Sequence, residues 1–332
     1  MAYFSCKSQI ANRKSSVYRP MFPSAHVSVQ VDLPRVRQNV ELIARRTGVP
    51  IIAVVKADAY GLGARQVAKA IGDLVDGFYV FDAAEAMRYA LFDLTGRRTI
   101  VLRGDSPDAA DYLARRIQPV AWTEDRARAL RPMHPIVSVD TGQQRFGCDR
   151  ALLRQIAAAG DIQEAMTHAT TVAQASSLKR ALDDAGLVPC RAHAAGSSLL
   201  DQPAAWLDTV RPGLAMYRGA VRVTTHLVEA RDSTGPAGYG GFVVNRHGVI
   251  LAGYSNGLRP GPCLVNGRPS RVLEVGMQSA FVECAAGDRA GDEIVLLGDG
   301  VELDAIASQW RTSQHEALLR LAELGPKNYV PA

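Results

Sequence analysis

The sequence predicts a (β/α)8 TIM-like barrel followed by a mainly β C-terminal domain, an α/β architecture. Eight short apolar runs alternate with segments whose alanines and leucines recur at helical spacing, as far as about Gly213. The runs are almost continuously apolar, as expected for parallel strands that are buried on both faces. No break interrupts the eight units, which favours a closed barrel over an open doubly wound sheet. Beyond about Arg222 short strands separated by turns replace this pattern.

The eight expected strands are, in chain order, PIIAVVKA, GFYVF, TIVLRG, QPVAW, PIVSVD, EAMTHA, CRAHAA and LDTVRPG. The expected helices between them are ARQVAKAIGDL, AAEAMRYALFDL, PDAADYLARRI, TEDRARALR, RALLRQIAAAG and TTVAQASSLKRALDDAG. The seventh crossover, SSLLDQPAAW, is short, so the last helix is the least regular of the set.

We expect three parts along the chain. They are a basic N-terminal arm (1–26), the barrel (27–222) and a β domain (223–332). The linker lies loosely around residues 214–236. Asn266-Gly267 between two alternating segments predicts a β-hairpin, because both residues tolerate the positive φ of a type I′ turn. The alternating segment 27–33 is expected to add a strand to the β domain.

The basic arm carries Lys7, Arg13, Lys14 and Arg19, and no acidic residue precedes Asp32. It lacks the continuous apolar stretch of a secretory signal. We therefore expect a flexible arm, with a transit peptide as the alternative.

Composition points to a small-molecule partner. The net charge of +5 is small for 332 residues, and no basic cluster alternates with aromatic residues, so nothing indicates nucleic acid. No apolar run approaches the ~20 residues that span a bilayer. Five cysteines never form a CxxC pair, and the histidines show no metal-ligand spacing. We expect reduced thiols, no metal and a cytoplasmic location.

Several polar residues follow the expected strands. Active sites of such barrels lie at the carboxyl ends of the strands, so these residues share one rim. They are Lys56 after the first strand, Arg145 after the fifth, His168 at the end of the sixth, Ser197 and Ser198 after the seventh, and Arg211, Pro212 and Gly213 at the eighth.

The residue types on this rim predict a carbonyl cofactor with a phosphate group. A lysine beside low-dielectric walls and cations has a lowered pKa, which frees its amine for a Schiff base. Small residues and hydroxyls after the last two strands are where such barrels bind phosphate. Pyridoxal 5'-phosphate combines both features. A cofactor-free Schiff-base aldolase also fits the barrel, but it leaves the phosphate segments unexplained. Tyr60 is either a packing aromatic or a phenol that reaches the phosphate.

Five segments resemble motifs of the alanine racemase family, the fold-type III pyridoxal phosphate enzymes. They are VVKADAYGLG, VDTGQQRFG, THATT, HAAGSS and VRPGLAMY. The similarity extends from about Val27 to the C-terminus. It implies that Lys56 forms the Schiff base, that Tyr60 touches the phosphate, and that Arg145 contacts the cofactor phenolate and the substrate carboxylate. His168 would lie between an arginine and a tyrosine.

The same resemblance assigns the remaining cofactor contacts. Ser197 would bind the phosphate together with the backbone of Gly213 and Leu214. Arg211 would face the pyridine nitrogen. Because a guanidinium keeps its protons, that nitrogen would stay unprotonated, which disfavours transamination. Decarboxylases on the same barrel use an acid here, so Arg211 favours a racemase.

The β domain supplies the other half of the site by resemblance. AGYSNG is similar to the family's GYADG segment, which implies that Tyr254 enters the partner subunit's site as the second base. VLEVGMQS resembles the segment whose methionine N–H binds the substrate carboxylate, which suggests Met277. Racemisation needs one proton carrier on each face of the α-carbon, and Lys56 and Tyr254 would be that pair. The resemblance therefore implies a homodimer with shared active sites.

Several positions depart from the family pattern. His315 replaces a tyrosine that bounds the substrate side-chain pocket, and we count it among the substrate-binding residues. Ser138, Gln278 and Gly196 replace a lysine, an aspartate and an asparagine. The changes fall around the entrance and the side-chain pocket. The substrate is therefore expected to be alanine, serine or a larger or polar amino acid.

Other functions remain open at this point. One is a plain alanine racemase that tolerates these changes. A pyridoxal phosphate-dependent aldolase or lyase on a β-hydroxy amino acid is a second, for which His315 leaves room. A low-turnover pyridoxal phosphate-binding protein is a third, although mere binding requires neither Tyr254 nor Arg211.

Overall fold

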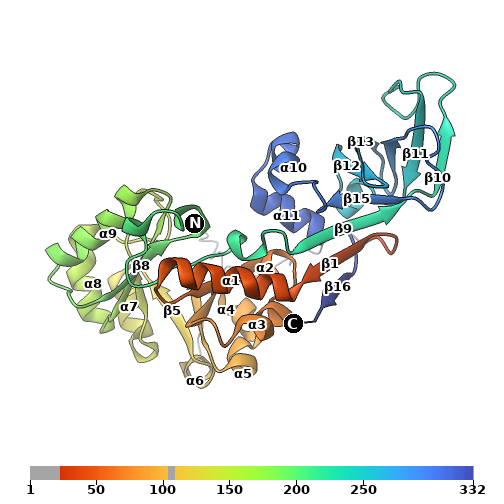
Figure 1. The fold of residues 1–332 in the computed structure, drawn as a ribbon. Coiled ribbons are helices and arrows are strands. Elements are labelled where there is room, and N and C mark those ends of the chain that lie inside the picture. The colour runs from red at the N-terminus through yellow and green to blue at the C-terminus, as the bar shows by residue number, and fades with distance from the viewer. Residues whose placement is uncertain (1–22, 104–108, 332) are drawn as a thin grey trace, which may run out of the picture.

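The computed structural model describes residues 23–103 and 109–331. The basic arm expected at residues 1–26 lies outside this part, apart from residues 23–26. The chain forms one parallel sheet and one larger, mostly antiparallel sheet (Figure 1). In the described chain no helix combines the length and the apolar character that a membrane crossing requires.

The parallel sheet is the barrel, and its strands follow one another in sequence order. They are β2 (Ile52–Val54), β3 (Gly77–Asp82), β4 (Arg98–Arg103), β5 (Ile117–Ala121), β6 (Ile136–Ser138), β7 (Glu164–Ala169) and β8 (Arg191–Ala195). They coincide with the first seven apolar runs. Large side chains from several strands, such as Ile52, Ile100 and Met166, pack together in one buried cluster, so the interior is a packed core and no pore.

The eighth run closes the barrel without forming a regular strand. Val210 bridges Ile51 on one side, and Thr209 bridges His193 on the other. The N–H of Ile52 donates to the carbonyl of Val210 (2.9 Å). The pairing reaches Pro212, whose carbonyl accepts the N–H of Val54 (2.8 Å), but Pro212 has no N–H with which to extend it. The (β/α)8 barrel prediction is confirmed, with an irregular eighth strand.

Helices cover the outside of the barrel. They are α1 (Leu33–Thr47), α3 (Ala64–Ile71), α4 (Ala83–Tyr89), α5 (Leu91–Thr95), α6 (Ala109–Ala114), α7 (Glu124–Leu130), α8 (Leu153–Gly160) and α9 (Val172–Asp184). Side-chain caps begin several of them; Thr171 and Gln174 form a capping box at α9. The 3-10 helix η2 (Arg150–Leu152) leads into α8, and η1 (Arg131–Met133) follows α7.

The last crossover has only the 3-10 helices η3 (Ser197–Leu199) and η4 (Pro203–Ala205). Its ten residues, SSLLDQPAAW, include a proline, and they are too few for a regular helix and two loops. The turn after the eighth run forms η5 (Leu214–Tyr217).

The second sheet has nine strands. In spatial order they are β10 (Glu229–Asp232), β11 (Arg246–Ile250), β14 (Ala280–Glu283), β13 (Arg268–Val275), β12 (Gly261–Val265), β15 (Glu293–Leu297), β9 (Val221–His226), β1 (Ser28–Asp32) and β16 (Lys327–Val330). Val265 faces Arg268 across Asn266-Gly267, whose φ values of 48° and 77° make the expected hairpin turn.

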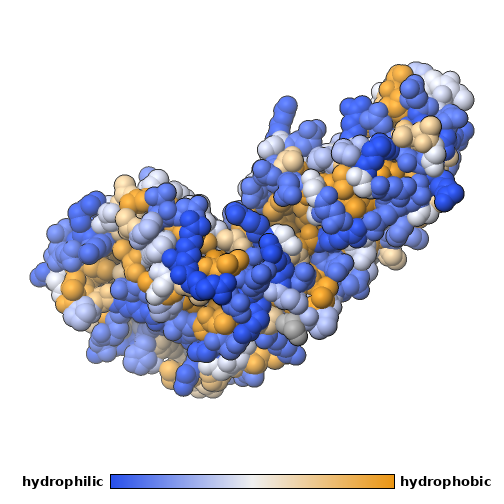
Figure 2. All heavy atoms as spheres, in the orientation of Figure 1, coloured by the Kyte–Doolittle hydropathy of each residue, from blue (hydrophilic) through white to orange (hydrophobic). Residues whose placement is uncertain are grey.

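β1 pairs with β9 and β16, so the segment 27–33 does add a strand to this sheet. β9 runs across residue 222, and the division into domains at that point stays a prediction. In Figure 1 this sheet extends away from the barrel, and α10 (Leu303–Trp310) and α11 (Gln314–Ala322) lie near the junction. Figure 2 shows the hollow between the two bodies, with hydrophilic and hydrophobic residues around it.

Candidate functional site

Lys56 lies at the mouth of the barrel, where β2 gives way to an unusual turn. The turn, α2 (Lys56–Tyr60), contains four consecutive non-glycine residues with φ between 52° and 59°. Such left-handed residues cost roughly 1–2 kcal/mol each, so the surroundings must hold the turn. Asp58 accepts the N–H of Ala64 (2.8 Å), and Glu85 accepts the N–H of Ala57 (2.7 Å). These contacts fix the backbone on both sides of the turn.

The Lys56 ammonium is half-buried among other cations. Burial lowers its pKa most, and the charges of Arg145 and Arg211 lower it further, while Glu85 opposes them. Loss of hydration and like charge both disfavour the protonated form. The site therefore favours a neutral, nucleophilic amine.

Arg211 is buried beneath this mouth. Its guanidinium donates to Nδ1 of His193 (2.5 Å) and to the carbonyl of Thr167, and its plane lies over the ring of Tyr79, 5.7 Å from the centroid. Since a guanidinium only donates, Nδ1 of His193 must be the acceptor. Burial, with the charge of Arg211, lowers the pKa of His193 to about 4. His193 is therefore neutral at physiological pH.

The carboxylate of Glu164 lies on the other side of His193 from Arg211 and supplies a negative charge. Oε1 of Glu164 lies 3.2 Å from Nε2 of His193, and both Glu164 oxygens accept from Arg98 at 2.5 and 3.0 Å. Burial alone would raise the pKa of Glu164, but the hydrogen bonds from His193 and Arg98 outweigh it and hold that pKa well below its usual range. The result is a continuous polar chain from Arg98 to Arg211 through the barrel interior.

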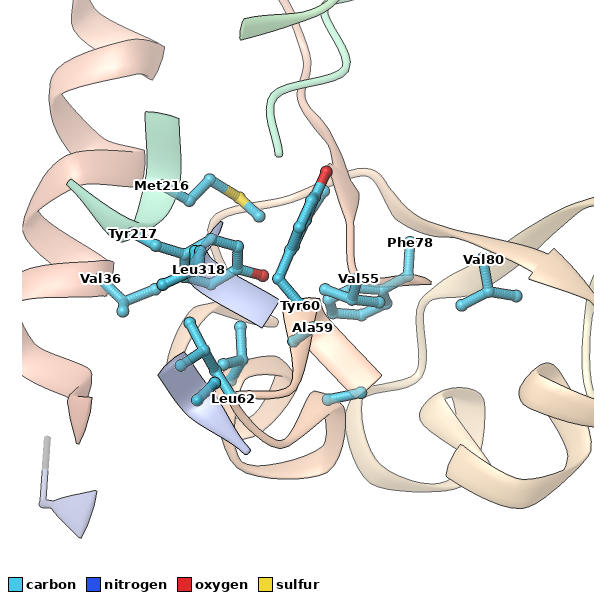
Figure 3. Close-up of a cluster of buried hydrophobic side chains, with 14 of the residues drawn as sticks. Val36, Val55, Ala59, Tyr60, Leu62, Phe78, Val80, Met216, Tyr217 and Leu318 are labelled. Atoms are coloured by element: carbon cyan, nitrogen blue, oxygen red, sulfur yellow. The ribbon is translucent and has the colours of Figure 1, made fainter. Parts of the chain in front are cut away.

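The phosphate segments form a compact cradle. Oγ of Ser197 accepts the N–H groups of Gly213 (3.0 Å) and Ala215 (3.1 Å). A Cβ at Gly213 would lie 2.2 Å from the hydroxyl of Tyr60, so only glycine fits this position. Leu214 follows directly and opens η5. Figure 3 shows the Tyr60 ring standing beside Met216 and Tyr217.

This cradle suits a phosphate. Its backbone N–H groups already point at one oxygen, and phosphate oxygens accept the same donors. The Tyr60 hydroxyl adds a neutral donor, because burial raises the pKa of this phenol to about 12. A carbonyl compound with a phosphate group therefore fits the residues present, with the amine of Lys56 for its carbonyl carbon.

His168 and Arg145 border the same mouth. His168 occupies β7; lost hydration, and then the charges of Arg211, Lys56 and Arg145, lower its pKa to about 4. Arg145 is exposed on the loop after β6, with its guanidinium 5.6 Å from the Phe146 ring. The structure thus brings together Lys56, Arg145, His168 and Arg211.

His315 reaches the site from α11. Its ring lies 5.6 Å from that of Tyr60, between centroids, and burial together with the charge of Lys56 lowers its pKa. It lines a cavity of about 870 Å³ between the barrel and the β sheet. Ser197 and Leu214 also line this cavity, so it opens directly onto the phosphate cradle. His315 therefore lines the cavity beside the phosphate cradle.

Tyr254 and Met277 lie together elsewhere. The N–H of Tyr254 donates to the carbonyl of Gly276 (2.9 Å), and a Cβ at Gly253 would lie 2.2 Å from the Met277 carbonyl. Their side chains are 53% and 61% exposed. In the described part of the chain, no hydrogen bond or ring contact joins either residue to Lys56.

Sequence reasoning missed three residues, Glu85, His193 and Glu164. Each acts through contacts with residues far away in the chain, and no local pattern marks such contacts. A weak signal existed for His193, which is a polar residue at an inward position of an expected strand.

Comparison with known proteins shows to which family the chain belongs. A family model described as the N-terminal domain of alanine racemase matches residues 31–221, more than half of the chain. This chain belongs to the alanine racemase family. The biosynthetic alanine racemase of Escherichia coli K12 is 27% identical, over 84% of this chain and 92% of its own length.

Solved structures of family members agree in fold. The biosynthetic alanine racemase from Pseudomonas aeruginosa is 26% identical, with a TM-score of 0.79 over 92% of this chain and 100% of that one. The alanine racemase from Bartonella henselae, which contains covalently bound pyridoxal phosphate, is 22% identical with a TM-score of 0.81, over 92% of this chain and 100% of that one; this likeness shows the fold. As a member of the family, the protein is an amino-acid racemase of the isomerase class, with pyridoxal phosphate as its cofactor.

Proposed function

We propose that the protein interconverts the L- and D-forms of a small amino acid, with Lys56 and the partner subunit's Tyr254 as the two bases. The observation that carries this proposal is the position of Lys56, whose amine has a lowered pKa at the barrel mouth beside Arg145 and Arg211. A structural lysine has no need of such surroundings, whereas an amine that must attack a carbonyl requires them.

The proposed position of the cofactor follows from the phosphate cradle. Ser197, Gly213, Leu214 and Tyr60 would hold the phosphate, and Nζ of Lys56 would hold the carbonyl carbon. When bound, pyridoxal phosphate supplies an electron sink that makes the substrate α-proton removable. The protein's part is to position the substrate, to move protons and to exclude competing reactions.

Proton transfer would use one residue on each face of the substrate. A lowered pKa favours the neutral form of Nζ of Lys56, the form that accepts the α-proton on its face. The hydroxyl of Tyr254 would deliver a proton on the other face. His168, whose low pKa keeps it neutral, could relay charge between this tyrosine and Arg211.

Arg211 would face the pyridine nitrogen as a permanent donor. Its hydrogen bonds to His193 and Thr167 lock the guanidinium in one orientation. With Glu164 and Arg98 behind them, Arg211 would keep its protons, and the ring nitrogen would stay unprotonated. This arrangement favours racemisation over transamination.

Substrate binding would use the exposed cation and the β domain. Arg145 and the N–H of Met277 would bind the carboxylate, as Tyr254 approaches from the partner. His315 and the cavity beside it leave space for a side chain larger than a methyl group. We therefore propose alanine, serine or a larger polar amino acid as the substrate.

A homodimer is the active unit under this proposal. Tyr254, Met277 and Tyr239 are large, exposed side chains, and the Tyr239 ring approaches Gly276, next to Met277. Such a cluster of exposed aromatic and apolar residues is typical of an interface. We also propose a cytoplasmic location, which suits the four free cysteines of the described chain.

The test is a panel of L-amino acids with chiral analysis of each product. D-isomers are expected from at least one of alanine, serine or a larger polar substrate. Lys56→Ala should abolish their formation, and Tyr254→Phe should abolish it while pyridoxal phosphate stays bound. Glycine and an aldehyde from a β-hydroxy amino acid would replace this proposal with a lyase. Bound cofactor without any turnover would replace it with a binding protein.

A further inference from the structure

We propose that Glu85 is a positioning residue of the site, which holds the left-handed turn of Lys56 by clamping the carboxyl ends of β2 and β3 together. The inference rests on the proposed function only for the role of Lys56. Glu85 touches neither cofactor nor substrate in this assignment; it acts through the lysine's backbone.

Both oxygens of the Glu85 carboxylate bind backbone N–H groups of different elements. Oε1 accepts from Ala57, the residue after Lys56, at 2.7 Å, and Oε2 accepts from Phe81 near the end of β3 at 2.8 Å. The hydroxyl of Tyr89 lies 3.4 Å from Oε1. Glu85 is itself fixed, because its N–H donates to Asp82 at the start of α4 (2.8 Å). A fixed carboxylate therefore ties two neighbouring strand ends together.

The turn needs such a clamp. Left-handed backbone at Ala57, Asp58, Ala59 and Tyr60 is unfavourable for side chains with a Cβ, and no glycine occurs among them. Without Glu85, the N–H of Ala57 would lose its partner as well. Ala57 is exposed, so water can replace its partner, whereas Phe81 is half-buried and its N–H would lose the same carboxylate. An unsatisfied donor costs up to roughly 1–3 kcal/mol as its burial increases, comparable to the strain of one or two of these residues. The clamp thus decides whether the turn, and with it the direction of Lys56, is maintained.

Glu85 is also the acid among the charges that face Lys56. Arg145 from the loop after β6 and Arg211 from the eighth run are the cations that face the lysine. His168 on β7 and His315 on α11 also face it, and the pKa of each imidazole is lowered, which favours its neutral form. Asp82 and Tyr89 are the titratable groups that face Glu85 itself. The Glu85 carboxylate therefore opposes the cations and limits how far they lower the pKa of Lys56.

Three variants separate position from charge. Glu85→Gln keeps the shape but offers one acceptor oxygen, so one N–H loses its partner and the charge disappears. Glu85→Asp keeps the charge but is one methylene too short to reach both amides. Glu124→Gln is the matched control, since Glu124 also lies in the first turn of a crossover helix, at α7, and pairs with Arg128 at the surface.

The experiment measures the full-length protein in two ways. Hydrogen exchange reports on the peptide that contains Ala57. Acetic anhydride labelling of Lys56, read by mass spectrometry as a function of pH after bound pyridoxal phosphate is removed, reports on the amine. Exchange should be about tenfold faster in both Glu85 variants, which corresponds to about 1.4 kcal/mol of lost protection. The labelling midpoint should move to lower pH in Glu85→Gln and stay near that of the wild type in Glu85→Asp.

Two results would overturn the assignment. If Glu85→Gln matches Glu124→Gln in both measurements, Glu85 does not hold the turn. If exchange accelerates while the labelling midpoint stays unchanged in Glu85→Gln, the residue has only a structural role. Neither measurement depends on racemisation, so failure of the proposed function and failure of this assignment are distinguishable.

Discussion

The guanidinium of Arg211 donates to Nδ1 of His193 at 2.5 Å, and His193 in turn lies 3.2 Å from the Glu164 carboxylate. All three side chains are buried. A permanent cation, a neutral imidazole and an anion therefore follow one another through the barrel, with Arg98 at the far end. This order favours a neutral His193 beside an ionised Glu164, because the guanidinium of Arg211 makes Nδ1 of His193 an acceptor and Arg98 donates to both Glu164 oxygens.

Stability should fall in mild acid because of His193. Its folded pKa of about 4 lies below the ordinary value of 6.5, so the unfolded chain binds the proton first. The contribution of His193 to the free energy of unfolding is complete above about pH 6.5. It is lost as the pH falls toward about 4, and the loss is on the order of 3 kcal/mol. Urea unfolding across this window checks it. His193→Asn should reduce the slope of the profile by about half, because His168 has the same lowered pKa and keeps its share. His226→Asn, at an exposed position of β9, should leave the profile unchanged. A wild-type profile that is flat in this window would contradict the argument.

Gly213→Ala should weaken pyridoxal phosphate binding at least about tenfold, or about 1.4 kcal/mol. The new Cβ would lie 2.2 Å from the Tyr60 hydroxyl and push this phenol away from the cradle. Gly196→Ala is the control, since a Cβ there meets its nearest atom, the Arg211 carbonyl oxygen, at 3.8 Å. Absorbance titration with the cofactor compares the two variants. Equal affinities would show that the phosphate binds elsewhere.

His315→Tyr should shift substrate preference toward alanine. The larger phenol would fill space beside Tyr60 that the imidazole leaves open. We expect the ratio of kcat/KM for L-serine to that for L-alanine to fall by about tenfold, the effect of about one methylene-sized change in a pocket. Gln314→Ala, which changes the neighbouring residue on the same cavity, should leave the ratio near that of the wild type. An unchanged ratio in His315→Tyr would remove His315 from the substrate pocket.

The sequence was sufficient for the barrel because its strands are local, apolar and regularly spaced. The eighth run is the exception. LDTVRPG has the composition of a strand, yet it forms only the bridges at Thr209 and Val210, and after Pro212 the chain turns into the cradle at Gly213. The short seventh crossover was recognisable from its length alone.

The rim residues could be predicted from their positions after strands, because parallel strands place their carboxyl ends together. The supports behind them could not. Glu85 reaches Ala57 from another helix, and Glu164 meets His193 across two strands, so both pairs depend on the closed fold. The left-handed turn could not be predicted either, since Ala-Asp-Ala-Tyr contains no glycine that would indicate positive φ.

The central claim is that each active site takes Lys56 from one subunit and Tyr254 from the other. It is tested most directly by mixing the inactive variants Lys56→Ala and Tyr254→Phe under conditions that exchange subunits. In a mixed dimer, the site with intact Lys56 receives an intact Tyr254 from its partner, so racemase activity should return to about a quarter of the wild-type value for statistical mixing. If subunits exchange and no activity returns, the two residues do not meet across an interface, and the shared two-base site is wrong.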